Sequence, residues 1–89
     1  MDSVSTQLVL ITWLDSGKIV GNEWTFTTDL PTTALVITCQ SVGWIVRETE
    51  EELVIAPHIG AERDGRPQQF LGLLAIPKVA IQQRTPLPF

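Results

Sequence analysis

Residues 41–60, SVGWIVRETEEELVIAPHIG, constrain the fold of this chain more than any other segment. From residue 42 onward, apolar side chains recur at every second position, which is typical of a strand with one buried face. Residues 48–52, ETEEE, are too polar to bury, and Pro57 limits the returning strand because it lacks a backbone N–H. The segment therefore predicts a central β-hairpin with an acidic, solvated tip. We expect its core-facing side chains to be Val42, Trp44, Val46, Leu53 and Ile55.

Two segments before this hairpin also have the composition of strands, because they are rich in β-branched and apolar residues. Residues 7–15, QLVLITWLD, end at the turn formers of DSGK, and a second short strand is expected at residues 19–20. Residues 33–40, TALVITCQ, run into the hairpin with little break. Ser41 and Gly43 are expected to mark a bulge or a sharp bend at that junction.

The segments after the hairpin alternate between loop-like and strand-like composition. Residues 58–69, HIGAERDGRPQQ, contain two glycines, a proline and four charged side chains, and they predict the longest loop. Residues 70–76 predict a strand, residues 77–78 a tight corner, and residues 79–83 a short last strand. Residues 84–89, RTPLPF, contain two prolines and are expected to stay outside any ladder, as a loose end or a strap.

Size and periodicity fit one small β-domain. A chain of 89 residues holds one core, so we expect a single domain over residues 1–89, with loose or strap-like ends at residues 1–6 and 84–89. Residues 23–31 fit a strand, an irregular wrap or a single helical turn, and sustained helical periodicity is absent. About five or six short, closely spaced strands indicate an all-β, antiparallel small barrel of the SH3-like, Sm-like or OB kind. A chain this small buries only about 60% of its unfolded surface, which favours self-association.

Charge, cysteine content and apolar runs limit the partners and the cellular compartment that we expect for the protein. The formal net charge is −4, and the six basic residues are scattered, so general binding to duplex nucleic acid is not expected. Cys39 is the only cysteine and sits in the apolar run LVITCQ, where a small core residue is the expected role. The N-terminal residues do not resemble a signal peptide, and apolar runs fall well short of the roughly 18 residues of a membrane span. We therefore expect a cytoplasmic protein without membrane contact.

The charged residues that follow the hairpin form the candidate ligand-binding group. His58 follows Pro57 at the end of a strand, and Arg63 and Arg66 lie in the glycine-containing run GAERDGR. Backbone N–H groups and guanidinium forks of such a loop can cradle a phosphate group. Together with Lys78, these three side chains are the predicted contacts for a small anionic ligand.

The three tryptophans, Trp13, Trp24 and Trp44, all lie in strand-like segments. Core packing is the expected role for at least two of them. A tryptophan outside the core would either stack on a nucleic-acid base or be buried between subunits. Base stacking needs a basic groove to hold the phosphates, which this acidic chain does not supply, so a subunit interface fits better.

The chain lacks the residue spacings that are typical of enzymes and metal sites. His58 and Cys39 are single residues without a partner at a defined spacing, and the acidic residues do not alternate with glycine or asparagine as in a cation-binding loop. Neither GxGxxG nor GxxxxGK[ST] occurs. We therefore expect no catalytic residue, no metal and no cofactor.

The succession TWLDS, Trp24, SVGWIV, VIAPH and IPKVAI resembles a group of short phage and prophage proteins to which no activity is attached. The likeness covers approximately residues 13–81 and is strongest in residues 41–46 and 76–81. More remotely, the strand order is similar to that of Sm-like proteins, which form rings of about five to seven subunits through edge-strand pairing. The resemblance implies a phage-encoded protein that works in the cytoplasm of the host cell.

Two non-enzymatic functions fit these observations. The first is a homo-oligomeric binding protein that engages a host protein or a small anionic, nucleotide-like ligand through His58, Arg63, Arg66 and Lys78. The alternative is a Sm-like ring that binds single-stranded RNA, which the acidic charge disfavours. An enzyme ranks third, because the sequence contains no activated nucleophile or positioned base.

Overall fold

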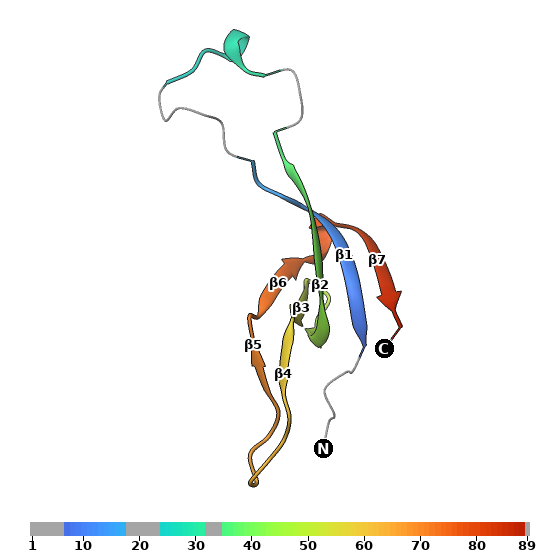
Figure 1. Ribbon diagram of the computed structural model, residues 1–89. Coiled ribbons are helices and arrows are strands. Elements are labelled where there is room, and N and C mark those ends of the chain that lie inside the picture. Colours follow the sequence, from blue (N-terminus) through green and yellow to red (C-terminus); the bar gives the residue numbers. More distant parts are fainter. Residues whose placement is uncertain (1–6, 18–23, 32–34, 89) are drawn as a thin grey trace.

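The computed structural model describes residues 7–17, 24–31 and 35–88, and these residues form an all-β fold (Figure 1). Strands make up most of the described chain, whose helical segments are two short 3-10 turns. The strands are β1 (Leu8–Asp15), β2 (Ile37–Glu48), β3 (Glu52–Ala56), β4 (His58–Gly60), β5 (Gln69–Leu71), β6 (Leu74–Pro77) and β7 (Ile81–Leu87), and the turns are η1 (Thr27–Asp29) and η2 (Lys78–Ala80).

Five of these strands form one antiparallel sheet in the order β6-β3-β2-β1-β7. The strands β4 and β5 pair with each other in a separate two-stranded ribbon. The expected all-β, antiparallel architecture is therefore confirmed. Within the described residues, the edge strands β6 and β7 do not pair with each other, so the closed barrel stays a prediction.

The five-stranded sheet is strongly curled, as an ion pair across its concave face demonstrates. Arg84 on β7 lies opposite Ile11 on β1, which in turn lies opposite Ser41 on β2. On a straight strand, with a rise of about 3.3 Å per residue, Glu48 would lie roughly 23 Å beyond Ser41. Arg84 nevertheless donates to both carboxylate oxygens of Glu48, at 2.9 and 3.0 Å. The far half of β2 must therefore bend back over β7.

The turn η2 carries the chain from one edge of the sheet to the other. It follows β6, which pairs with β3, and leads into β7, which pairs with β1. The backbone N–H of Lys78 in this turn donates to the carbonyl oxygen of Glu51 at 2.8 Å, which ties the corner to the β2–β3 turn. The corner predicted at residues 77–78 is confirmed: Pro77 is the N-cap residue of η2, which begins at Lys78.

The hydrophobic core lies on the concave face of the curled sheet. On β1 every second side chain points inward, at Val9 and Ile11. On β3 all residues from Leu53 to Ala56 are buried, so both faces of that strand are covered. Leu53 and Ile55 are buried, as predicted. Trp13, Leu74 and Ile81 are partly buried and pack against the core. The core cluster consists of Val9, Ile11, Ile45, Leu53, Ile55 and Ile76.

The core-facing side of β2 differs from the prediction. Ile45 is buried, whereas Val42 is exposed and Val46 and Trp44 are only partly buried. The predicted alternation is present, but the face assignment is wrong for these residues. When both faces of a strand carry apolar residues, the alternation does not reveal which face is buried. A shift of one residue in the assignment then exchanges the buried face with the exposed one.

The bulge in β2 lies at Val46 and not at the predicted Ser41 or Gly43. Pairing with β1 continues residue by residue through Ser41 and Gly43, and the register with β3 shifts between Ile45 and Arg47. Gly43 has a different role, because a Cβ at this position would come within 3.0–3.1 Å of backbone atoms of Ala56. The glycine allows this close approach of the two strands.

The structure corrects two predictions for the segment after β3. The loop predicted for residues 58–69 is shorter than expected, because β4 and β5 pair from His58 opposite Leu71 to Gly60 opposite Gln69 and leave residues 61–68 as the connection between them. The single strand predicted for residues 70–76 is divided into β5 and β6 at Gly72, whose φ of 84° favours glycine.

The last strand, predicted at residues 79–83, begins at Ile81, because residues 79 and 80 belong to η2. It runs to Leu87 and includes Pro86, which lies opposite Val9. The expectation that residues 84–89 stay outside the ladder is therefore wrong for residues 84–87. Proline is tolerated at this position because β7 is an edge strand, whose outer side needs no ladder donor.

Two segments project from the curled sheet in opposite directions (Figure 1). One is the connection between β1 and β2, called the excursion here and described for residues 16–17, 24–31 and 35–36. It contains η1, so of the three alternatives for residues 23–31 the single helical turn is the one observed. The short strand predicted at residues 19–20 lies outside the described residues. The other projection is the β4–β5 ribbon. The longest extent of the chain is consequently 60 Å, against 25 and 22 Å in the other two directions.

Candidate functional site

The β4–β5 ribbon ends in a two-residue turn that brings Arg63 and Arg66 together. Asp64 and Gly65 form this turn with φ values of 53° and 73°. Positive φ at both central residues defines a type I′ turn, for which Asp-Gly is a preferred sequence because its twist matches that of the flanking strands. The backbone N–H of Arg66 donates to the carbonyl oxygen of Arg63 at 2.9 Å, and the reciprocal bond is 3.3 Å long. The arginines are therefore a directly opposed cross-strand pair.

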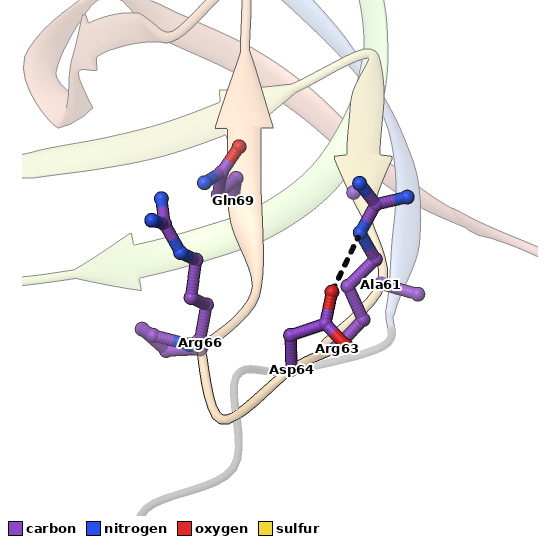
Figure 2. A pocket seen from close by; sticks show the side chains of 7 residues that line it. Ala61, Arg63, Asp64, Arg66 and Gln69 are labelled. Atoms are coloured by element: carbon purple, nitrogen blue, oxygen red, sulfur yellow. Dashed lines mark ion pairs between the residues drawn. The ribbon is translucent and has the colours of Figure 1, made fainter.

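The side chains of Arg63 and Arg66 extend from the two arms of this hairpin, and Asp64 lies beside Arg63 (Figure 2). Residues in such opposed positions have Cβ atoms about 5 Å apart, and like charges placed there destabilise the ladder. The Asp64 carboxylate lies 3.7 Å from Nε of Arg63, but both side chains are almost fully exposed, so this pair is weak. Arg66 makes no ion pair with any other described residue. Glu62 and Asp64 balance the formal charge of the two arginines, and of these four side chains only Asp64 and Arg63 are paired in the described structure.

A hollow of about 550 Å³ lies beside the arginine pair. Its size falls within the range of roughly 300–1,000 Å³ that is common for small-molecule sites. All of its lining residues are exposed, so a single chain leaves this hollow open to water. Its polar side chains are two guanidinium forks and one carboxamide, which can bind an anion, and the Asp64 carboxylate, which is already next to Arg63. The lining residues are Gly60, Ala61, Arg63, Asp64, Arg66, Pro67 and Gln69.

The structure brings together two of the four predicted ligand contacts, Arg63 and Arg66. His58 is exposed at the start of β4, on the same ribbon as Arg63 and Arg66, but it does not line the hollow. Lys78 is separate, because it lies in η2 and its Nζ is 2.7 Å from a carboxylate oxygen of Glu48. The predicted group of four therefore divides into the arginine pair at the turn, a separate histidine at the base of the same ribbon, and an ion-paired lysine at the sheet corner.

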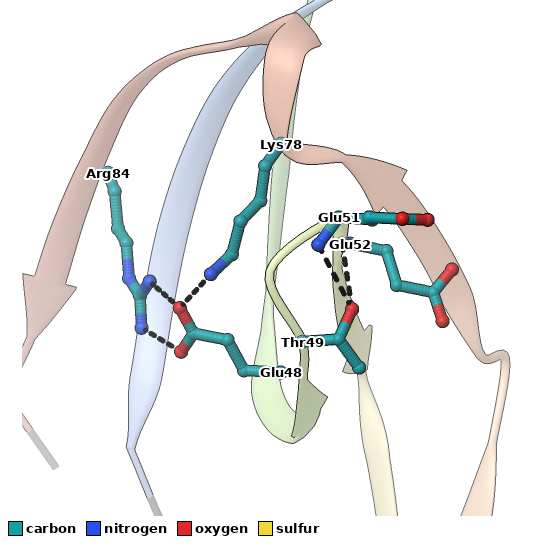
Figure 3. Close-up of polar contacts among 6 residues, drawn as sticks. All are labelled: Glu48, Thr49, Glu51, Glu52, Lys78 and Arg84. Carbon is teal, nitrogen blue, oxygen red and sulfur yellow. Dashed lines mark hydrogen bonds and ion pairs between the residues drawn. The ribbon is translucent and has the colours of Figure 1, made fainter.

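Lys78 and Arg84 converge on Glu48 from two different elements (Figure 3). Hydrogen bonds from Arg84 and then from Lys78 lower the pKa of the Glu48 carboxyl from 4.5 to about 2. Glu48 was expected to belong to a solvated tip, and this expectation is wrong for this residue. It instead links the far end of β2 with η2 and β7.

The β2–β3 turn itself is organised by Thr49. Its hydroxyl oxygen accepts hydrogen bonds from the backbone N–H groups of Glu51 and Glu52, at 3.2 and 3.1 Å (Figure 3). A hydroxyl that satisfies nearby backbone donors in this way favours a turn over continued strand. The Glu52 carboxylate also accepts a hydrogen bond from Arg47 at 2.8 Å. The acidic segment is thus a structural turn.

The tryptophans and the cysteine occupy different environments. Nε1 of Trp13 donates to the Ser41 hydroxyl at 3.0 Å, and the ring packs against the core. Trp44 is partly buried, whereas Trp24 is fully exposed on the excursion. Cys39 was expected in the core, but it is only partly buried, opposite Trp13 in the ladder.

Comparisons with known proteins leave the site to be interpreted from its geometry. The chain matches no protein-family model, no curated protein sequence and no solved structure. In the described parts of the chain, His, Cys, Asp and Glu side chains do not gather in groups of three or more that could hold a metal ion. The same residues contain no helix of the length and apolar character needed to cross a membrane. Residues 60–69, which carry Arg63 and Arg66 at their turn, form the arginine hairpin.

The Asp-Gly turn was the signal in the sequence that could have revealed the arginine hairpin. Asp-Gly between two extended segments is among the strongest short-range signals for a two-residue hairpin turn. The prediction missed it because the flanking residues are charged and do not alternate with apolar ones. The proximity of Glu48 to Arg84 has no local signal, because it depends on the bend of β2.

Proposed function

We propose that the protein is a non-enzymatic, homo-oligomeric binding protein of phage origin that takes a small anionic ligand at its arginine hairpin. The opposed pair of Arg63 and Arg66 is the observation that carries the proposal. Two like charges in opposed positions of one turn are unfavourable, and an anion that contacts both side chains removes that cost. Phosphate groups suit this arrangement best, because guanidinium forks bind them bidentately. The ligand class is therefore phosphate-bearing and nucleotide-like.

We further propose that the curled sheet is a small SH3-like barrel. Its support is the strand order, in which the first and last long strands pair and a 3-10 turn joins the two edge strands. The ion pairs of Glu48 with Lys78 and Arg84 hold the far end of β2 over β7. In this arrangement the barrel is a rigid support, and the arginine hairpin is the element that it presents.

Isothermal titration with ATP and with pyrophosphate tests the ligand proposal. We expect wild-type protein to bind both probes, and we expect Arg63→Ala and Arg66→Ala each to weaken binding by about tenfold, as for loss of one charged hydrogen-bonding group. Arg47→Ala is the matched control, because Arg47 is also exposed but is paired with Glu52 at 2.8 Å. Absence of binding at millimolar probe, or an equal loss in the Arg47→Ala variant, would contradict the proposal.

A host protein with an acidic surface is the second candidate partner. The observation that favours it is the shape of the site, since the ribbon projects from the sheet and all lining residues are exposed. An open site covers a small ligand poorly, whereas exposed arginines are common contact residues in protein interfaces. A fluorescent poly-glutamate peptide distinguishes the candidates. Binding of this peptide without binding of ATP favours the protein partner.

The Sm-like RNA-binding ring has less support. Base stacking and phosphate contacts must lie side by side for single-stranded RNA to bind. The exposed Trp24 and the arginine pair instead lie on projections at opposite ends of the chain (Figure 1). The edge strands also contain Pro77 and Pro86, which limits pairing between subunits. We expect no electrophoretic shift of oligo-uridylate RNA at micromolar protein and low salt.

A further inference from the structure

The excursion exposes large apolar side chains that no part of its own chain covers in the described structure. Trp24 is 102% exposed and Phe26 is 79% exposed. Solvated singly, such residues are ordinary, but several of them on one projecting segment mark a candidate interaction surface. The large apolar residues exposed on the described part of this segment and at the adjoining start of β2 are Trp24, Phe26, Leu30, Leu35, Val36 and Ile37.

This surface is held in a defined conformation. The backbone N–H of Asp29 donates to the carbonyl oxygen of Phe26 at 2.9 Å, and that of Leu30 donates to Thr27 at 3.3 Å. The η1 turn formed in this way contains no buried residue. At the base of the excursion, a Cβ on Gly17 would overlap the Leu35 carbonyl, so glycine is needed for the close approach of the two arms. The segment is therefore ordered locally but has no apolar cover of its own.

The charge of the excursion favours a protein as its partner. Its sequence, residues 16–36, contains three ionised side chains, Lys18, Glu23 and Asp29, for a formal charge of −1. Anionic membranes and nucleic acids attract clusters of lysine and arginine, and a single lysine beside two acidic residues is no such cluster. A nearly neutral apolar patch is, in contrast, complementary to a copy of itself, because pairing two such patches brings few like charges together.

The exposed apolar area is sufficient for a stable contact between two copies. We estimate about 400 Å² for the two aromatic side chains and about 200 Å² for the four aliphatic ones, scaled by their exposures. A standard interface buries about 800 Å² per partner, of which roughly 500 Å² is apolar. One excursion thus supplies the apolar part of one side of such an interface.

From these observations we infer that two copies of the chain associate through their excursions in a twofold-symmetric dimer. A twofold axis places the same patch on both sides of the contact, which a single self-complementary surface requires. Because the arginine hairpin projects from the opposite end of a chain 60 Å long, this dimer leaves both hairpins free at its outer ends. This last point rests on the proposed function and makes the dimer bivalent for anions.

Sedimentation equilibrium over about 1 to 100 µM protein tests the dimer. We expect a mass twice the 9.9 kDa of one chain. Trp24→Ala and Phe26→Ala should each raise the dissociation constant at least about tenfold. Val79→Ala is the control, because Val79 is 99% exposed on η2, outside the excursion, and its truncation should leave the mass unchanged. Thermal midpoints equal to wild type show that the variants fold, as expected for exposed positions.

Three results would overturn the inference. They are a monomer at every concentration, a mass that keeps growing beyond the dimer, and equal dissociation by Val79→Ala and Trp24→Ala. Growth beyond the dimer would point to a head-to-tail contact, with the excursion seated in the apolar groove of about 250 Å³ beside Val42, Pro57 and Leu74. Titration of Trp24→Ala with ATP separates this test from that of the proposed function. Retained ATP binding by a monomeric variant leaves the hairpin site intact, and a dimer that binds no anion refutes the ligand proposal alone.

Discussion

The carboxylate of Glu48 should make the stability of this fold pH-dependent. Its pKa falls from 4.5 to about 2 because Arg84 and then Lys78 donate hydrogen bonds to it. At about 1.4 kcal/mol per pKa unit, the difference between 4.5 and about 2 corresponds to at most about 3.5 kcal/mol of folding free energy. The side chains of Glu48 and Arg84 are 36% and 38% exposed, so solvent screening reduces the contribution to about 1–2 kcal/mol.

The direction of the pH dependence follows from which state, folded or unfolded, binds the proton of Glu48 more tightly. The unfolded chain binds it with the higher pKa, so the ionised Glu48 stabilises the fold fully above about pH 5. This stabilisation is lost progressively as the pH falls from about 4.5 towards about 2. Glu48→Gln removes the charge at every pH and leaves Lys78 and Arg84 facing each other. We therefore expect the variant to be less stable than wild type at pH 7 and nearly equal to it near pH 2.

Urea denaturation of both proteins at several pH values measures this difference directly. At pH 7 the variant should lose about 1–2 kcal/mol of unfolding free energy, or roughly 5–10 °C in Tm. Glu50→Gln is the control, because Glu50 is exposed in the same turn and forms no ion pair with the described residues. A gap between wild type and Glu48→Gln that stays constant from pH 7 to pH 2.5 would refute the reasoning.

Three further substitutions test the core, the strand crossing and the turn. Ile11→Ala should lower the unfolding free energy by about 2–5 kcal/mol in denaturant titrations because its side chain is fully buried, whereas Val79→Ala should change it by less than about 0.5 kcal/mol. Gly43→Ala should lower it by about 1–3 kcal/mol, because the new methyl group would lie only 3.0–3.1 Å from the Ala56 backbone, and an unchanged Tm would contradict this packing. Gly65→Ala places a side chain at φ 73° and should weaken pyrophosphate binding while leaving the core stable, as measured by calorimetry and thermal melting.

The sequence was sufficient to predict the fold class because strand composition and turn residues are local signals. Residues 7–15 and 41–56 are strands close to where their composition placed them, and the corner at residues 77–78 is present. The face of β2 was not predictable in the same way. Val42 and Ile45 are both apolar, and only the pairing partners on β1 and β3 determine which of them is covered.

The site was predictable in part, for the same physical reason. The grouping of His58, Arg63 and Arg66 on one ribbon follows from their nearness in the sequence. The ion pairing of Lys78 depends instead on contact with Glu48, thirty positions earlier in the chain. Such contacts arise from the curl of the sheet and leave no mark on local composition. The prediction therefore offered Lys78 as a ligand contact, although its ammonium group is already paired with Glu48.

An NMR titration of ¹⁵N-labelled protein with pyrophosphate tests the central claim most directly, because it locates the bound anion. The proposed function predicts that the largest chemical-shift changes occur at the Arg63 and Arg66 Nε–Hε groups and at the backbone amide of Gly65. The amides of Lys78 and Arg84, whose side chains are already paired with Glu48, should change little. Shifts concentrated at Lys78 and Arg84, or no saturable shift at the hairpin, would contradict the claim.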